Sequence, residues 1–87
     1  MNIQFHSSLE KSLDKLRVGE KERFFDRIRI FQNNPHDKIL NTHRLKGTWS
    51  GHFSINIGGD LRAVYYVTSV GTIVFVTIGT HHQLYNN

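Results

Sequence analysis

Residues 57–67 read Ile57-Gly58-Gly59-Asp60-Leu61-Arg62-Ala63-Val64-Tyr65-Tyr66-Val67 and determine how the second half of the chain can pair into a sheet. Two glycines and an acid mark a turn, and the run that follows alternates in the manner of a half-buried β-strand. Because strand side chains alternate between two faces, a slip of one residue in the pairing would turn every side chain over. The face that must be buried therefore selects the length of the turn.

A three-residue turn over 58–60 keeps charge out of the core. A two-residue turn at Gly58-Gly59 would instead place Asp60 and Arg62 opposite isoleucines. The longer turn gives an apolar face with the pairs Ile57–Leu61, Ile55–Ala63 and Phe53–Tyr65. The opposite face receives the pairs Asn56–Arg62, Ser54–Val64 and His52–Tyr66. We expect the functional residues on this second face, which mixes polar and aromatic side chains.

The remaining strands of the second half complete an antiparallel meander. A strand over His52–Ile57 precedes the central strand Leu61–Val67, and a turn at residues 69–72 leads into a last strand over Ile73–Ile78. Alternation in the last strand predicts Val74, Val76 and Ile78 in the core, and Ile73, Phe75 and Thr77 on the open face. The same parity directs His81 toward the open face.

Helical periodicity dominates residues 7–32. Ser7 and Glu10 fit a capping box that starts a first helix, and Gly19 suits the end of that helix after Val18. A second helix, from Glu20 to Gln32, carries the apolar stripe Phe24, Phe25, Ile28 and Phe31 and is ended by Asn33-Asn34-Pro35. A short strand over residues 2–6 precedes both helices. The predicted core joins Leu13, Leu16, Phe24, Ile28 and Phe31 to Phe53, Ile55, Ile57, Leu61, Ala63, Tyr65 and Val67.

The order of elements predicts one α+β domain over residues 1–87. It consists of an N-terminal strand, a two-helix hairpin and a three-stranded antiparallel meander, with the helices packed on one face. The first strand joins the meander either as a separate edge or beside the last strand. A chain of 87 residues buries only ~60% of the surface that it exposes when unfolded, so the core is expected to be marginal.

Composition restricts the classes of function. The chain has no cysteine, which excludes disulfides and thiolate metal sites, and its six histidines offer no helical i, i+4 pair for a metal. We therefore predict no metal and no small-molecule cofactor. Without a long apolar run or a signal-peptide pattern, we expect a cytoplasmic protein that does not engage a membrane. The formal net charge of +4 favours an anionic partner.

Four motifs follow one another in the second half of the chain. They are His43-Arg44-Leu45-Lys46-Gly47, Trp49-x-Gly51, Ile57-Gly58-Gly59-Asp60-x-Arg62-x-Val64-Tyr65 and Ile78-Gly79-Thr80-His81-x-x-Leu84-Tyr85. In order and spacing they resemble the RelE/ParE toxin superfamily, and within it the YafQ-like toxins of type II toxin–antitoxin modules. The resemblance covers nearly all of residues 43–85, whereas the first half shares only the pattern of elements.

The resemblance implies a RelE-like fold and a small ribonuclease. Such a toxin cuts messenger RNA in the ribosomal A site and is held inactive by a cognate antitoxin protein, so ribosome, mRNA and antitoxin are the implied partners. The family's catalytic positions fall on His43, Asp60, His81 and Tyr85. Its shared basic position falls on Arg62, and we expect Arg44, Lys46 and Trp49 to contact RNA or phosphate beside it. Packing under its own loop is an equally open role for Trp49.

These residue types suit metal-free RNA cleavage. The reaction needs a base for the 2′-hydroxyl proton, an acid for the leaving 5′-oxygen and positive charge at the phosphate. Histidine side chains titrate near neutral pH, and each acid or base role is typically worth ~10²–10⁴ in rate. His43 and His81 would share these roles, and Arg62 and Lys46 would donate to phosphate oxygens. Asp60 would orient an imidazole, act as the base, or merely bond its own turn.

The chain departs from the YafQ-like pattern at three positions. Asn56, Leu61 and Thr77 stand where the resemblance would place histidine, tryptophan and arginine. The missing arginine leaves Arg44, Lys46 or Arg62 to stabilise phosphate charge. Two alternatives stay open: a non-enzymatic ParE-like inhibitor of DNA gyrase, which does not need the histidine pair, and a catalytically degenerate member that only binds its antitoxin.

Overall fold

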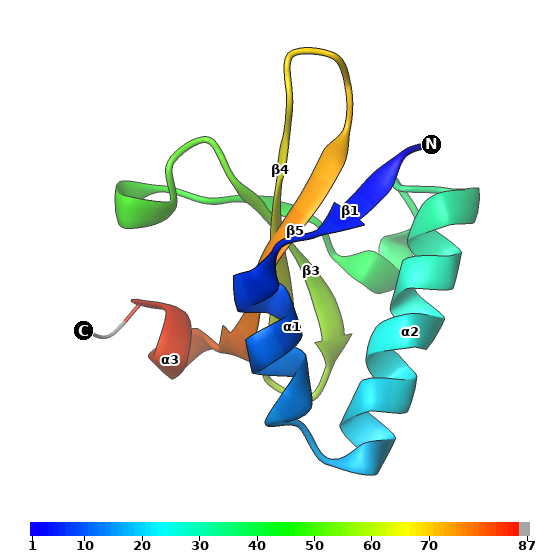
Figure 1. Cartoon of the computed structure of the whole chain (residues 1–87), viewed down its shortest axis with the longest axis vertical. Coiled ribbons are helices and arrows are strands. Elements are labelled where there is room, and N and C mark those ends of the chain that lie inside the picture. Colours follow the sequence, from blue (N-terminus) through cyan, green and yellow to red (C-terminus); the bar gives the residue numbers. More distant parts are fainter. Residues whose placement is uncertain (86–87) are drawn as a thin grey trace.

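A mixed five-stranded sheet forms the centre of the computed structural model, which describes residues 1–85 (Figure 1). The strand order is β1-β5-β4-β3-β2, with β1 parallel to β5 and every other neighbouring pair antiparallel. The elements are β1 (Ile3–Phe5), α1 (Ser7–Asp14), α2 (Val18–Asn33), η1 (Lys38–Leu40), β2 (His43–Arg44), η2 (Gly47–Trp49), β3 (Phe53–Gly58), β4 (Leu61–Val67), β5 (Ile73–Thr80) and α3 (His81–Tyr85). The predicted α+β fold is confirmed, and β1 takes the place beside the last strand. Residues 86 and 87 of the predicted domain lie outside the described part.

The helices α1 and α2 lie on one side of the sheet (Figure 1), but their ends differ from the prediction. His6, not Ser7, caps α1, because its ring nitrogen accepts a hydrogen bond from the Ser8 amide at 3.1 Å. The Glu20 carboxylate accepts from the Arg17 backbone amide at 2.8 Å and starts a new helix there. The helix α1 therefore ends at Asp14, and Gly19 lies inside α2 and does not stop the first helix.

The hairpin of β3 and β4 keeps most of the predicted register and corrects its turn. Four cross-strand pairs are as predicted: Phe53–Tyr65, Ser54–Val64, Ile55–Ala63 and Asn56–Arg62. A β-bulge at Ile57 then pairs Gly58 with Leu61, so the turn is Gly59-Asp60 and the predicted Ile57–Leu61 pair does not form. The bulge inserts one residue into one strand and still leaves both Ile57 and Leu61 buried.

A second bulge changes which side chains of β5 face the helices. The register shifts between Val64 and Tyr65, so that Val64 pairs with Thr77 and Tyr65 pairs with Phe75. Phe75 is fully buried in the helix-facing core, contrary to the predicted alternation, and Ile73 packs against the same core. Val76, predicted in that core, packs instead against a second cluster.

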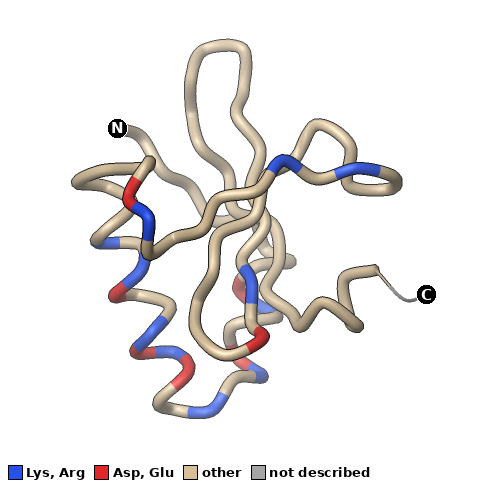
Figure 2. The backbone as a smooth tube through the Cα atoms, turned by 180° about the vertical axis from the view of Figure 1, so that it is seen from behind, with Lys and Arg blue, Asp and Glu red and all other residues tan. Residues whose placement is uncertain are grey.

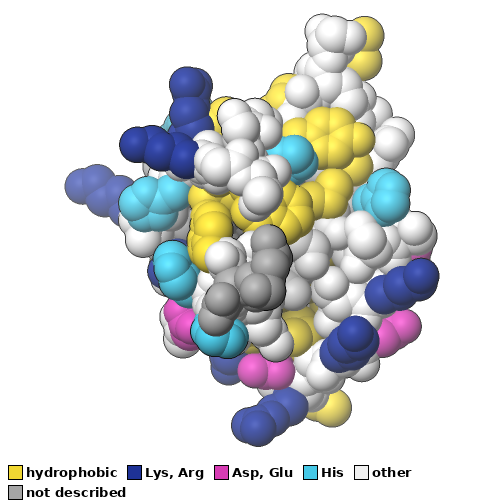
Figure 3. Space-filling view, turned by 90° about the vertical axis from the view of Figure 1, so that its left-hand side faces the viewer, with side chains coloured by type: hydrophobic (Ala, Val, Ile, Leu, Met, Phe, Trp, Pro, Cys, Tyr) yellow, Lys and Arg dark blue, Asp and Glu magenta, His cyan; other side chains and the backbone are white. Residues whose placement is uncertain are grey.

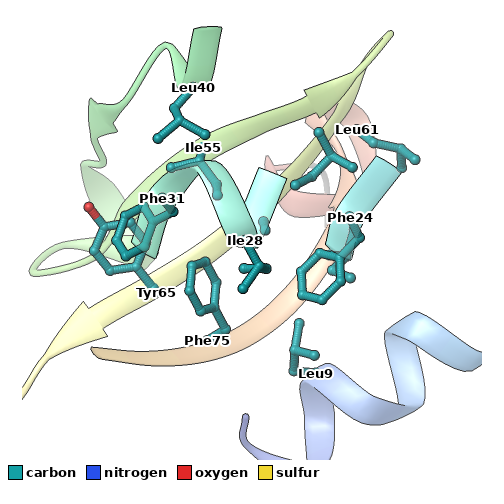
Figure 4. Packing of buried hydrophobic residues seen from close by; sticks show 12 residues of the cluster. Leu9, Phe24, Ile28, Phe31, Leu40, Ile55, Leu61, Tyr65 and Phe75 are labelled. Carbon is teal, nitrogen blue, oxygen red and sulfur yellow. The ribbon is translucent and has the colours of Figure 1, made fainter. Parts of the chain in front are cut away.

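The main core joins the helices to the sheet and combines aliphatic side chains with a group of aromatic rings (Figure 4). Phe75 contacts Phe24, Phe31 and Tyr65, with ring centroids 5.1–6.4 Å apart. Burial of the tyrosine raises the pKa of Tyr65 above its ordinary value of 10.0. Two predicted apolar positions are wrong, because Phe25 and Val67 are each 47% exposed.

The opposite face of the sheet carries a smaller apolar cluster. Leu45, Val64 and Leu84 are buried there, with Trp49 and Val76 packed against them. These residues come from the segment after β2, from the two central strands and from α3, so elements too short for any periodicity cover part of this face. The cluster lies beside the polar side chains that the sequence places on the same face.

Candidate functional site

A cavity of about 540 Å³ opens on this second face. Its lining has a single sign of charge, with three cationic side chains, two imidazoles and no carboxylate. The lining residues are His43, Arg44, Leu45, Lys46, Gly47, Ser54, Arg62, His81 and Tyr85. Figure 3, which views this side of the molecule, shows histidines around an apolar surface, with lysines and arginines at the upper left and at the lower right. Six of the eight predicted site residues therefore meet in one place.

Strand pairing positions one side of the cavity. His43 on β2 pairs with Ser54 on β3, and Ser54 pairs in turn with Val64 on β4, so the three residues form a row across the sheet. Ser54 is only 1% exposed and is the one polar residue among the buried side chains of residues 1–85. Arg62 lies two residues before Val64 and therefore points to the same face.

The helix α3 supplies the facing side. His81 and Tyr85 are four residues apart, which places them on one face of that helical turn, and their ring centroids are 4.7 Å apart. Both residues are exposed, as is His43. His81 reaches the cavity because β5 ends at Thr80 and the chain turns into α3, and not through the strand parity that the sequence predicts.

Arg62 is the deepest cation of the cavity. Its Nη1 atom is buried and has no hydrogen-bond partner among residues 1–85. A buried guanidinium nitrogen without an acceptor is costly to the fold. The ion pair with Asp60 that the sequence allows does not form, since the one salt bridge in the described part joins Arg29 to Asp26.

The other two cations lie nearer to solvent. Arg44 and Lys46 are exposed, and the Arg44 guanidinium carbon lies 5.7 Å from the centroid of the Phe53 ring. That cation–π contact directs the Arg44 side chain over a neighbouring strand. Because Phe53 packs against the helix-facing core, this contact draws the Arg44 guanidinium toward the face of the sheet opposite to His43, although Arg44 also lines the cavity.

Two predicted site residues lie outside the cavity lining. Asp60 is exposed in the β3–β4 turn. Trp49 is half-buried and packs against the second cluster, and its Nε1 donates a hydrogen bond to the Leu84 carbonyl oxygen at 2.9 Å. The sequence leaves two roles open for Trp49, which are contact with RNA and packing under its own loop. The contacts of Trp49 within the chain match the second role.

The three departures from the family pattern have contacts within the fold. The Asn56 side-chain oxygen accepts from the Gly58 amide at 3.0 Å and so supports the bulge. Leu61 belongs to the main core. The Thr77 hydroxyl lies 3.0 Å from the Ser12 hydroxyl of α1, and Thr77 is absent from the cavity lining. Within residues 1–85, the cationic residues that line the cavity are therefore Arg62, Arg44 and Lys46 alone.

Sequence reasoning gave no functional role to Leu45 or Ser54. Both residues line the cavity. Leu45 lies between two predicted basic site residues, and Ser54 lies on the predicted open face, so their positions in the sequence are consistent with a place in the lining. Within residues 1–85, no three histidine or acidic side chains are grouped so as to hold a metal ion. In the same residues, no helix is both long and apolar enough to span a bilayer.

The comparisons with known proteins agree on one group. A family model described as the bacterial toxin of type II toxin–antitoxin system, YafQ, matches residues 1–86. The chain is similar in structure to YafQ from E. coli strain BL21(DE3), with 19% identity, 98% of each chain covered and a TM-score of 0.80. It is also similar to the archaeal RelE–RelB complex from Pyrococcus horikoshii OT3, with 20% identity, 91% of this chain and 92% of that chain covered, and a TM-score of 0.70.

A third solved structure is a heterotetrameric YoeB–YefM toxin–antitoxin complex from Staphylococcus aureus. The chain is 19% identical to the matched chain of that complex, and the match covers 93% of this chain and 97% of that one, with a TM-score of 0.70. No curated protein sequence matches the chain significantly.

Proposed function

The chain belongs to the YafQ family of bacterial type II toxin–antitoxin toxins, and on this premise we propose that it is a ribosome-dependent mRNA endoribonuclease. The observation that carries the proposal is the cavity on the open face. His43 from β2 and His81 from α3 line this cavity together with Arg62. A gyrase inhibitor that does not cut nucleic acid would not need a histidine pair in this cavity.

The proposed reaction proceeds through the 2′-hydroxyl without a metal. One imidazole takes the proton from the 2′-oxygen, which attacks the neighbouring phosphorus. The bond from phosphorus to the 5′-oxygen breaks, and the other imidazole gives that oxygen a proton. The products are a 2′,3′-cyclic phosphate and a free 5′-hydroxyl. His43 and His81 fill the two proton-transfer roles, each worth ~10²–10⁴ in rate.

The remaining lining residues stabilise and orient the RNA. Arg62 donates to the phosphate oxygens, whose negative charge grows in the transition state, and its half-buried position makes such bonds stronger than they would be in open solvent. Arg44 and Lys46 attract the RNA backbone from the border of the cavity. Tyr85, beside His81, offers a ring on which a base can stack. Asp60 lies outside the lining, so a contribution from its carboxylate requires a separate test.

An antitoxin protein is the proposed inhibitor. The Staphylococcus complex pairs a YoeB toxin with the antitoxin YefM, and the archaeal RelE is in complex with RelB. A net charge of +4 favours an acidic segment as the occupant of the positive face. Ribosome, mRNA and antitoxin are thus the proposed partners of the same surface.

The test is to incubate purified protein with translating ribosomes and to map the 5′ ends of the mRNA. We expect new ends with the wild-type protein, and a loss of ~10²–10⁴ in rate for His81→Ala and His43→Ala. His82→Ala is the matched control, since His82 is the neighbouring histidine and does not line the cavity. Asp60→Asn decides whether the turn carboxylate takes part. Absence of cleavage together with inhibited supercoiling would replace the proposal with gyrase inhibition.

A further inference from the structure

The helix α3 carries two side chains of the cavity but has few contacts to hold it in place. It is five residues long, far below the ~12–15 residues that an isolated helix needs to be even marginally stable in water. It also stands between two cavities. His81 and Tyr85 line the first, whereas Gln83 and Leu84 line a second cavity of about 520 Å³ toward the end of α1.

Specific bonds at both ends compensate for this sparse packing. At the start of α3, the Thr80 amide donates to Gln83 Oε1 at 2.8 Å, and the Gln83 amide donates to the Thr80 hydroxyl at 3.1 Å. This reciprocal arrangement is a capping box. At the other end, the Leu84 carbonyl would have no partner within so short a helix, and it accepts the 2.9 Å hydrogen bond from the Trp49 indole.

The Trp49 bond links the two segments that supply the histidines. Trp49 ends η2, six residues after His43, and its partner Leu84 lies between His81 and Tyr85 in the sequence. The side chains of Trp49 and Leu84 also belong to the same apolar cluster. On its far side, the indole ring meets the His52 ring edge-on at 5.3 Å, which limits its freedom to stack on a base.

We propose that Trp49 is a positioning residue that fixes α3 and thereby sets the placement of His81 and Tyr85 relative to His43. The consequence for catalysis rests on the proposed function, whereas the consequence for the structure of α3 does not. An indole N–H is a donor only, so its one hydrogen bond is committed to the Leu84 carbonyl. This role is distinct from contact with RNA, which would use the ring face.

The variant Trp49→Phe tests the proposal, because it keeps an aromatic ring and removes the N–H donor. We expect cleavage on translating ribosomes to fall by about 10-fold to 100-fold, as for a catalytic group displaced by about 1 Å. In the His81→Ala background, Trp49→Phe should cause little further loss, since it acts through His81. Tyr66→Phe is the control: Tyr66 lies in the same row of rings, 5.5 Å from His52, and no hydrogen bond or ring contact within residues 1–85 joins it to α3. Full additivity of the two losses would overturn the proposal.

Nuclear magnetic resonance tests the same role without any cleavage. Trp49 is the single tryptophan, so one indole N–H signal reports on the bond to Leu84. We expect slow hydrogen exchange of that proton in the wild-type protein and faster exchange in Gln83→Ala, which breaks the cap at the other end of α3. Unchanged exchange would overturn the proposal, even if Trp49→Phe does not fold. If the wild-type protein cut no mRNA, the proposed function would fail while this comparison still decided the positioning role.

Discussion

Arg62 leaves a side-chain donor unsatisfied inside the fold. Its Nη1 atom is buried without an acceptor, and an unsatisfied buried donor costs a fold about 1–3 kcal/mol. Its neighbours in the strand, Leu61 and Ala63, are buried in the main core, so the backbone here cannot move to expose the side chain. If Arg62 binds phosphate as proposed, this constraint on the backbone would hold its guanidinium in place before RNA arrives, which is the condition for electrostatic catalysis.

Replacement of Arg62 should separate activity from stability. For Arg62→Ala we expect a loss of ~10²–10³ in cleavage rate, the cost of removing one preorganised donor. The melting temperature should stay the same or rise, because an unsatisfied donor leaves the interior. Arg44→Ala is the control, since Arg44 is exposed at the cavity border and its loss should weaken RNA binding at low salt more than it slows the reaction. A lower melting temperature for Arg62→Ala would show that the residue is structural.

At the scale of elements, the sequence predicts strands whose side chains alternate regularly, and it does not reveal where that alternation is interrupted. The alternating run from Phe53 to Tyr65 settles four cross-strand pairs, because a buried face allows one register. The extra residues at Ile57 and Val76 are β-bulges, which leave no mark in an alternating pattern. The bulge at Val76 also reverses the faces of the rest of β5. This is why Phe75 is in the core although parity places it outside.

The sequence motifs predict which residues meet in the candidate site. They do not predict the short elements that hold those residues in place. His43, Arg62 and His81 meet in one cavity, as the family resemblance implies. The two-residue strand β2 and the single turn α3 that position them are too short for any periodicity to reveal. The bond from Trp49 to Leu84 spans 35 positions of sequence and depends on tertiary packing alone.

The glycines of the β3–β4 hairpin should differ sharply in their tolerance of a side chain. Gly58 has φ +130°, outside the left-handed helical region, so Gly58→Ala should lower the free energy of unfolding by about 1–3 kcal/mol. The added Cβ would also lie 2.6 Å from Nε of Arg23, although that exposed side chain can move away. Gly59, at φ +56° with open space around it, should cost less when changed to alanine.

Gly19 supplies the matched control in the same chain. It lies in the first turn of α2, and an alanine there would meet nothing within 4 Å. Gly19→Ala should therefore be neutral or stabilising, by up to about 1 kcal/mol. Urea unfolding of the three variants measures all of these differences, and equal losses for Gly58→Ala and Gly59→Ala would contradict the strain assigned to the bulge.

At the scale of the whole molecule, charge is divided between the two sides of the sheet. Figure 2 shows acidic and basic residues alternating along α1 and α2, whereas the segment from β2 to η2 carries basic residues alone. Among residues 1–85, the cavity lining holds three basic residues and no carboxylate, so RNA and an acidic antitoxin would both be attracted to that face. Occupation of this face by an acidic segment would keep RNA from Arg62 and the two histidines.

Production of the protein in cells tests this competition. We expect the wild-type chain alone to arrest growth, because free toxin would cut mRNA, and co-expression of an acidic antitoxin to restore growth by covering the positive face. His81→Ala should be produced alone without arrest, since it lacks one proton-transfer group and keeps the fold. Binding of the purified wild-type protein to that antitoxin should weaken as salt rises, in proportion to the charges that pair. Arrest that persists in His81→Ala would mean that toxicity comes from binding and not from cleavage.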